Sequence, residues 1–251
     1  MLILICLMMG CAPSNHVYVK PHYQDQPFSI SNVLIMIEYL EIKDDIKGLW
    51  NFSEGRNLFQ QDQLYATAQL MLEQKGYGVA AMHLKTSGLI IDRSFAVEHY
   101  IGDKQQGVIS PPYIVRSYNL DESQIQGLEM LLAELNRPLS PAMVDLRSYV
   151  KNNYKQQMSA IDLDDNMAIL IIQVYRPRVS VFANVGVMVS LSSSGSHGSY
   201  VGVGGHNQSP ISVAYLLHKG TGDVIWSNKT TLITEKNRDK FFTELPFNAE
   251  Q

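Results

Sequence analysis

Three consecutive segments constrain the fold of this chain most strongly. Residues 32–40 are a near-continuous apolar run of strand length, which is typical of a strand covered on both faces. The segment 57–75 has apolar residues at helical spacing: Leu64, Ala68, Met71 and Leu72. Gly76 is suited to end that helix, and a second strand is expected at 79–84. A β–α–β unit of this length favours right-handed parallel pairing, so we expect an α/β domain.

Two further helices are expected in the middle of the chain. Asp121 and Gln124 have the spacing of a capping box, in which two side chains satisfy backbone N–H groups at a helix start. Pro141 suits the first position of another helix, which we expect to reach Met158. The segment 85–119 has a mixed pattern with a Ser-Pro-Pro-Tyr break. It is interpreted as an irregular insertion or an extra hairpin.

The last third of the chain has the pattern of strands. The expected elements are a central strand at 167–175, a hairpin of strands at 211–217 and 224–233, and a short helix at 238–245. The turn of the hairpin, 219–223, contains two glycines. Residues 28–251 are therefore expected to form one α/β (α+β) domain, a mixed β-sheet with helices packed on it.

The N-terminus has the pattern of an export signal. Residues 1–9 are an unbroken apolar run, followed by Gly10 and Cys11. A spanning helix needs about 20 apolar residues, so the run is too short to cross a bilayer, but it suits the core of a signal peptide. No Lys or Arg precedes the core, a departure that an upstream start would explain. The alternative is a buried N-terminal strand with a chance Gly-Cys pair.

Residues 8–11, Met-Met-Gly-Cys, resemble the lipobox of bacterial lipoproteins. The resemblance implies that residues 1–10 are removed and that the Cys11 thiol carries a diacylglycerol. Residues 11–27 hold three prolines and few apolar side chains, so we expect a flexible lipidated tether. Ala12, rather than Asp, follows the cysteine, which by the same resemblance implies the periplasmic face of the outer membrane. Several acyl chains make such an anchor stable.

Composition limits the partners and the chemistry. The net charge of −4 argues against nucleic acid, which needs a clustered basic surface. After cleavage Cys11 would be the only cysteine, with its sulfur blocked by lipid, so we expect no disulfide, thiol nucleophile or cysteine metal site. No later segment reaches 18 uncharged apolar residues, so no further membrane span is expected.

Few residues suggest a reactive site. The glycine-rich stretch 195–206 lacks the lysine of a phosphate-binding loop and has strand-like flanks, so we interpret it as a β-loop. The acidic run 162–165 lacks the spacing of a calcium loop and predicts a solvated turn. His83 lies in a predicted strand and is expected to be a satisfied core or edge histidine. No serine has a Gly-x-Ser-x-Gly elbow. We expect no catalytic residue, no metal and no cofactor.

The order of elements resembles bacterial envelope lipoproteins with a TolB-N-terminal-like or CsgG-like α/β domain. The residues that carry the resemblance are 8–11, 33–40, 58–76, 167–175 and the turn and strand from Gly222 to Ser227, and they cover 28–84 and 160–250. The resemblance implies an accessory or structural subunit of a trans-envelope machine, usually in a ring. A narrower resemblance is to outer-membrane core subunits of Dot/Icm type IVB secretion systems.

We therefore expect a non-enzymatic outer-membrane lipoprotein that is a structural or assembly subunit of a trans-envelope complex such as a secretion system. Its partners would be the bilayer, through acylated Cys11, and other subunits of that complex. The candidate partner-contact residues are Ser194, His197, Tyr200, His206 and Trp50. The alternatives are a stand-alone lipoprotein that binds a small molecule or glycan, and an unrecognised hydrolase.

Overall fold

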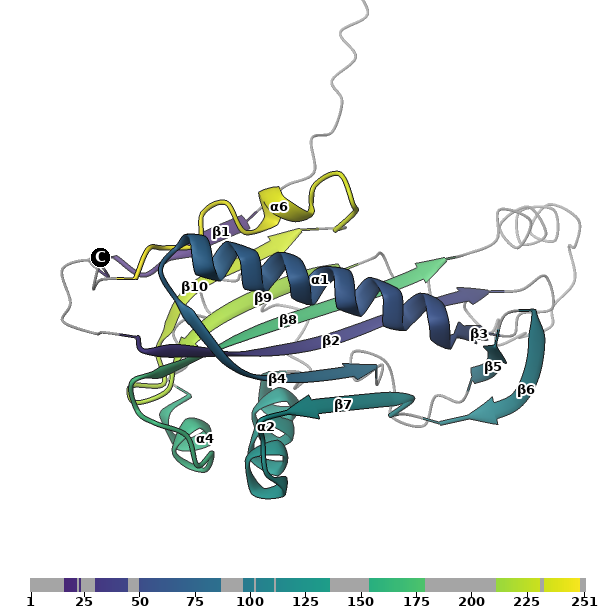
Figure 1. The fold of residues 1–251 in the computed structure, drawn as a ribbon, viewed down its shortest axis with the longest axis horizontal. Helices are drawn as coiled ribbons and strands as arrows, with labels where there is room; N and C mark the ends of the chain where they lie inside the picture. The colour runs from purple at the N-terminus through teal and green to yellow at the C-terminus, as the bar shows by residue number, and fades with distance from the viewer. Residues whose placement is uncertain are drawn as a thin grey trace, which may run out of the picture.

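The computed structural model of the 251-residue chain describes residues 16–21, 23, 30–44, 50–86, 97–101, 103–110, 112–135, 154–178, 211–230 and 233–248. These residues form one mixed sheet with helices packed on it (Figure 1), which confirms the expected α/β class. In chain order the elements are β1 (His16–Val19), β2 (Asn32–Asp44), β3 (Trp50–Ser53), α1 (Glu54–Gln74), β4 (Gly78–Thr86), β5 (Val97–Ile101), β6 (Lys104–Ile109), β7 (Ile114–Tyr118), α2 (Glu122–Leu135), α4 (Lys155–Ser159), β8 (Met167–Arg178), β9 (Ile211–His218), β10 (Val224–Thr230) and α6 (Arg238–Phe241).

The two apolar strands that the sequence predicts, β2 and β8, lie at the centre of the sheet. They run parallel and in register from Asn32 opposite Met167 to Lys43 opposite Arg178. On the far side of β8 follow β9, β10 and β1, each antiparallel to its neighbour. On the other side of β2, β4 pairs parallel with its first part and β3 antiparallel with its last three residues. The parallel β–α–β unit is thus confirmed.

Helix α1 covers one face of the sheet. Its residues Leu64, Ala68 and Leu72 are buried in the same apolar cluster as Ile35 and Ile37 of β2. The helix ends as expected at Gly76, which has φ 84°. The Gly76 N–H donates to the Glu73 oxygen at 3.0 Å, and the Tyr77 N–H donates to the Leu72 oxygen at 3.0 Å. This is the hydrogen-bond pattern of a Schellman cap, which needs the left-handed conformation that glycine adopts without strain.

Helices α2 and α4 lie on the opposite side of the sheet from α1 (Figure 1). Leu128, Leu131 and Leu132 of α2 pack in one cluster with Leu34 and Met36 of β2. The strand β2 is therefore covered on both faces, as its sequence predicts.

The capping box at the start of α2 is also confirmed. The Gln124 N–H donates to Asp121 Oδ1 at 2.8 Å, and the Asp121 N–H donates to Gln124 Oε1 at 3.0 Å. The hydrogen bonds to the Asp121 carboxylate, first from the Gln124 N–H, hold its pKa below the ordinary value. Both groups of the box lie within four residues, so local sequence was sufficient to predict it.

The segment 85–119 is more regular than an irregular insertion, and the alternative of an extra hairpin is correct. Strands β5 and β6 form an antiparallel hairpin, and β7 pairs antiparallel with β4. The Tyr113 N–H donates to the Thr86 oxygen at 2.7 Å, which holds the start of β7 against the end of β4. The β4–β7 pairing joins residues at least 28 positions apart, so a local pattern did not reveal it, whereas the β5–β6 hairpin is local.

The expectation of an unpacked tether over 11–27 is wrong for residues 16–21 and 23. Strand β1 pairs with β10 from His16 opposite Lys229 to Val19 opposite Trp226. The Lys20 N–H then donates to the Ile225 oxygen at 2.8 Å, and the Tyr23 side chain is buried. Pairing with β10 satisfies the backbone groups of this short segment, and its run Val17-Tyr18-Val19 favours a strand although prolines lie on both sides of it. The expected signal peptide and Cys11 lie outside the described residues.

Two predicted boundaries also change. The prediction of one helix from Pro141 to Met158 is wrong at Tyr154. This residue is the non-helical N-cap of the one-turn helix α4. Residues 136–153 lie outside the described residues, as does the stretch 179–210, which includes the glycine-rich segment 195–206. The last helix, α6, is shorter than the predicted 238–245.

Candidate functional sites

The predicted contact residues are not brought together by the described part of the chain. Ser194, His197, Tyr200 and His206 lie outside it, as does Cys11. The backbone of Trp50 begins β3 opposite Asp44. The acidic run 162–165 precedes β8 as a loop, as predicted, with Asp165 largely exposed.

His83 is a satisfied core histidine, as expected. Its side chain is 0% exposed, and both ring nitrogens have partners. Nδ1 lies 2.8 Å from Ser117 Oγ on β7, and Nε2 lies 3.1 Å from Glu129 Oε1 on α2. The second oxygen of Glu129 pairs with Lys85. The cluster therefore joins β4, β7 and α2 through one buried ring.

The residue types Ser117, His83 and Glu129 are those of a catalytic triad, but their arrangement differs from one. In the triad the serine lies on Nε2, and an unshared carboxylate on Nδ1 stabilises the imidazolium. Here the serine lies on Nδ1, and the Glu129 charge is shared with Lys85. Burial tends to raise the pKa of Glu129, but hydrogen bonds from His83 and Lys85 hold it below the usual range. The described geometry thus fits a structural ion pair better than an activated nucleophile.

A second polar cluster occupies the carboxyl ends of β2 and β8. From β2 the chain passes through α1 on one face to β4, and it later returns through α2 and α4 on the other face to β8. The helices therefore diverge between β2 and β8. In open α/β sheets, ligands bind outside the carboxyl ends of strands at such a switch point.

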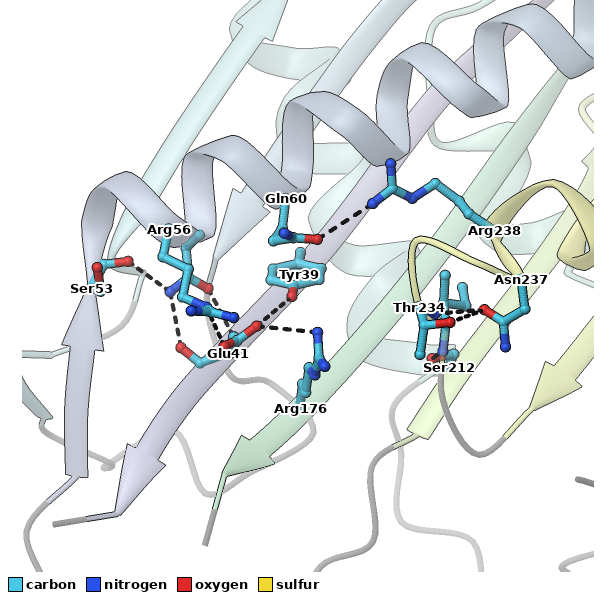
Figure 2. A network of polar contacts seen from close by, with 12 residues as sticks. Tyr39, Glu41, Ser53, Arg56, Gln60, Arg176, Ser212, Thr234, Asn237 and Arg238 are labelled. Atoms are coloured by element: carbon cyan, nitrogen blue, oxygen red, sulfur yellow. Dashed lines mark hydrogen bonds and ion pairs between the residues drawn. The ribbon is translucent and has the colours of Figure 1, made fainter. Parts of the chain in front are cut away.

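Glu41 of β2 is the centre of this cluster (Figure 2). Its side chain is only 4% exposed, yet it faces two guanidinium groups. Arg56 of α1 pairs with Oε1, and Arg176 Nη1 of β8 lies 3.6 Å from Oε2. The Tyr39 hydroxyl donates to Oε2 at 3.0 Å. A buried carboxylate is tolerated when it is paired and hydrogen-bonded in this way.

The same environment changes the acidity of Tyr39. Burial is the main cause that raises its pKa, and the negative charge of Glu41 and the hydrogen bond to it raise it further. Tyr39 therefore keeps its proton at neutral pH and acts as a hydrogen-bond donor to Glu41.

Asn57 of α1 binds the backbone of Glu41 as a neighbouring strand would. The Glu41 N–H donates to Asn57 Oδ1 at 2.8 Å, and Asn57 Nδ2 donates to the Glu41 oxygen at 2.9 Å. Nδ2 also donates to the Ser53 oxygen at 2.9 Å. On this side of β2, pairing with β4 reaches Glu38 and pairing with β3 begins at Ile42. Asn57, at 0% exposure, thus fills the gap between two partner strands.

Sequence reasoning missed this cluster, although a signal was present. The buried residues of α1 are Asn57, Gln61, Leu64, Ala68 and Leu72, so two amides continue the apolar stripe toward the helix start. Gln61 Oε1 accepts a hydrogen bond from Arg116 at 3.0 Å. Amides on the buried face of a helix require polar partners on the opposing surface. Those partners are the backbone of Glu41 for Asn57 and the Arg116 side chain for Gln61.

A cavity of about 500 Å³ lies beside Glu41. It is lined by Glu41, Lys43, Asn51, Phe52, Ser53, Arg56, Tyr100 and Asp103. Within the part of the chain that the structure describes, no group of three or more His, Cys, Asp or Glu side chains is placed to hold a metal ion.

Comparisons with protein-family models, with curated proteins and with solved structures found no match to this chain.

Proposed function

We propose that this chain is a lipid-anchored envelope protein that serves, without catalysis, as a structural or assembly subunit of a trans-envelope complex such as a secretion system. The resemblance of residues 8–11 to a lipobox supports the anchor, with acylated Cys11 on the periplasmic face of the outer membrane. Among the described helices, none is long and apolar enough to span a membrane.

The position of β1 sets how far the domain stands from such an anchor. Strand β1 begins at His16, five residues after Cys11. A fully extended chain covers at most about 3.6 Å per residue, so the anchor would lie no more than roughly 18 Å from the start of β1. The lipid would therefore hold the β1 edge of the domain close to the bilayer. A longer free tether would leave the orientation of the domain open.

The assembly role is supported by the side of the sheet that lies opposite β1. Strand β1 ends one side of the strand order, while β5, β6 and β7 lie on the other side of β2. Among the described residues, four of the nine exposed large apolar side chains lie on these three strands: Ile101, Val108, Val115 and Tyr118. Exposed apolar groups on edge strands are typical of surfaces that pair with another protein.

The partner is thus proposed to be another subunit of the complex, in a ring, that adds an extended segment to the free edge of β7, which pairs only with β4 among the described strands. The anchor and the contact surface would lie at opposite ends of one rigid sheet. With strands about 4.8 Å apart, the six spacings from β1 to β7 place the contact edge roughly 29 Å from the anchored edge.

A charge substitution on the far edge tests the assembly role. Tyr118→Lys, at a side chain 62% exposed, is expected to remove the chain from a large assembly after gentle detergent extraction and sizing. Leu70→Lys is the matched control, because Leu70 is 53% exposed on α1, about two turns beyond the helix residues Gln61 and Asp62 that bond to β7. Both variants should keep the far-ultraviolet circular dichroism of the parent. A monomeric parent, or equal loss of assembly in both variants, would contradict the proposal.

The anchor has its own test. Cys11→Ser should move the protein from the outer-membrane fraction to the soluble periplasmic fraction, because no acyl chain could then be attached. Continued membrane fractionation of this variant would exclude the lipid anchor and leave the far-edge contact untouched.

A further inference from the structure

Two outer strands of the described sheet lack the usual protection against pairing with another strand. Among the described strands, β1 pairs only with β10 and β7 only with β4, and they lie on opposite sides of the sheet (Figure 1). Neither strand contains proline, lysine or a bulge, the features by which proteins commonly block edge-to-edge pairing. The other outer strand, β6, begins with Lys104, and its ladder with β5 has a register shift between His99 and Tyr100. Strands β1 and β7 are therefore the edges best suited to accept a further strand.

A ring requires two different surfaces on each subunit. In a ring, a surface of each copy meets a different surface of the next copy, whereas a surface that meets itself closes a dimer. The proposed contact at β7 therefore needs a complementary surface elsewhere in the ring. If that surface belongs to the same chain, β1 is the described edge that can continue the sheet from the opposite side.

The two edges run in the same direction, which determines how copies would join. Strand β1 is antiparallel to β10, and two further antiparallel pairings lead through β9 to β8, which is parallel to β2. On the other side, β4 is parallel to β2, and β7 is antiparallel to β4. Both outer strands thus run opposite to β2. Copies that follow one another in the same orientation would place β7 and the next β1 side by side in parallel.

The side chains of the two edges fit one register. Val19 lies opposite Trp226, which is buried in the apolar cluster beneath α1, and Tyr118 lies opposite Met82, which packs against the same cluster. Opposed residues share a face of the sheet, so Val19 and Tyr118 are both on the α1 face. Their exposed fractions are 41% and 62%. Placing Val19 beside Tyr118 would cover both side chains and keep the alternation of faces across the junction.

The charges that follow the two strands are opposite in sign. Lys20 follows β1, and Asp121 and Glu122 come soon after β7 at exposed positions. Lys20 lies 2.8 Å from Asp223, and 23% of its side chain remains exposed. Because the strands would run parallel, these charges would lie at the same end of the junction. Complementary charges of this kind orient partners and set their register more than they add affinity.

We propose that the partner of β7 is the β1 edge of a second copy of this chain, paired in parallel with Tyr118 beside Val19. The second copy names the partner of the contact edge already described, so the pairing rests on the proposed function. The path from β1 through β10, β9, β8, β2 and β4 to β7 has six strand spacings, and the junction adds a seventh. At about 4.8 Å per spacing, successive copies would repeat every 34 Å or so along a continuous sheet. Each lipid anchor would then lie beside a junction between copies.

Disulfide cross-linking between introduced cysteines tests the junction in the full chain. Neighbouring strands are about 4.8 Å apart, within the Cα separation that a disulfide spans. Val19→Cys/Tyr118→Cys should form a ladder of cross-linked dimers, trimers and larger chains under mild oxidation. The two sites of one chain lie roughly 29 Å apart and cannot bond to each other.

Val19→Cys/Val115→Cys is the matched control for this cross-link. Val115 is 46% exposed on the same strand, but it lies opposite Lys85, which pairs with Glu129 of α2. Its side chain is therefore on the other face of the sheet, and this variant should cross-link at least about fivefold less. A ladder no stronger than that of the control, in variants that keep the circular dichroism of the parent, would overturn the junction.

Single variants distinguish this junction from other assemblies. Tyr118→Cys and Val19→Cys should each give no ladder alone, and a mixture of the two should give a cross-linked dimer. Strong cross-linking of Tyr118→Cys with itself would overturn the junction in favour of paired β7 edges. Loss of the large assembly in Tyr118→Lys but not in Val19→Lys would overturn the second copy as partner and leave the assembly role of β7 intact. A monomeric parent would contradict the assembly role itself and the junction with it.

Discussion

The Asn57 side chain offers the sharpest test of how α1 is fixed on the sheet. Asn57→Ala removes three buried hydrogen bonds, two to the Glu41 backbone and one to the Ser53 oxygen. Each contributes about 1 kcal/mol net, and each buried backbone group left unpaired costs about 1–3 kcal/mol. Allowing for overlap between these effects, we expect the free energy of unfolding to fall by roughly 3–5 kcal/mol. That is a large part of the 5–15 kcal/mol typical of a domain.

The isosteric change Asn57→Asp separates hydrogen bonding from packing. The aspartate keeps an acceptor for the Glu41 N–H, but it replaces the two donations from Nδ2 with a carboxylate oxygen that faces the carbonyls of Glu41 and Ser53. It also adds a negative charge beside Glu41. We therefore expect Asn57→Asp to lower the free energy of unfolding by at least as much as Asn57→Ala, although the side-chain volume is unchanged.

Equilibrium unfolding in urea, followed by circular dichroism, measures these differences. Thr67→Ala is the control on the same helix, because its hydroxyl donates to the Gln63 oxygen at 2.9 Å at an exposed position. It should change stability by no more than about 0.5 kcal/mol. If Asn57→Ala lowers the free energy of unfolding by less than about 1 kcal/mol, the Asn57 amide does not take the place of a strand partner for Glu41.

Two further predictions concern the Glu129 cluster and the glycines. Burial raises the Glu129 pKa, but the hydrogen bonds from His83 and Lys85 outweigh it and leave the folded-state pKa below the ordinary value of about 4.3. The stability that these contacts contribute is therefore fully present above about pH 4.3 and is lost as the pH falls through the folded-state pKa. Urea midpoints between pH 7 and 3 should therefore fall more steeply in the parent than in Glu129→Gln, and parallel curves would contradict this. Gly222→Ala should destabilise by at least roughly 2 kcal/mol, because Gly222 has φ +71° and a Cβ there would lie 2.2 Å from the Lys155 nitrogen. Gly55→Ala, with nothing within 4 Å, should be neutral or stabilise by up to about 1 kcal/mol in thermal unfolding, and similar losses in both variants would rule out the steric explanation.

Much of the core could be predicted because its signals are strong and local. The apolar runs of β2 and β8 and the stripe of α1 predicted two central strands and the helix between β2 and β4. The polar cluster was harder, because Asn57 and Gln61 become informative only when the opposing surface is known. Glu41 and Asn57 are sixteen residues apart in sequence, and no local pattern indicates that the amide of one binds the backbone of the other.

Local sequence is enough to predict the α/β class, the helix caps at Asp121 and Gly76, and the strand character of β2 and β8. These features depend on side chains within a few residues of one another, so local physical chemistry is sufficient. The folded arrangement is needed to see that residues 16–19 are an edge strand and that Lys43, Asn51 and Glu98 lie in one row across three strands. Both depend on strand register between distant segments, and a shift of one residue would turn every side chain to the other face.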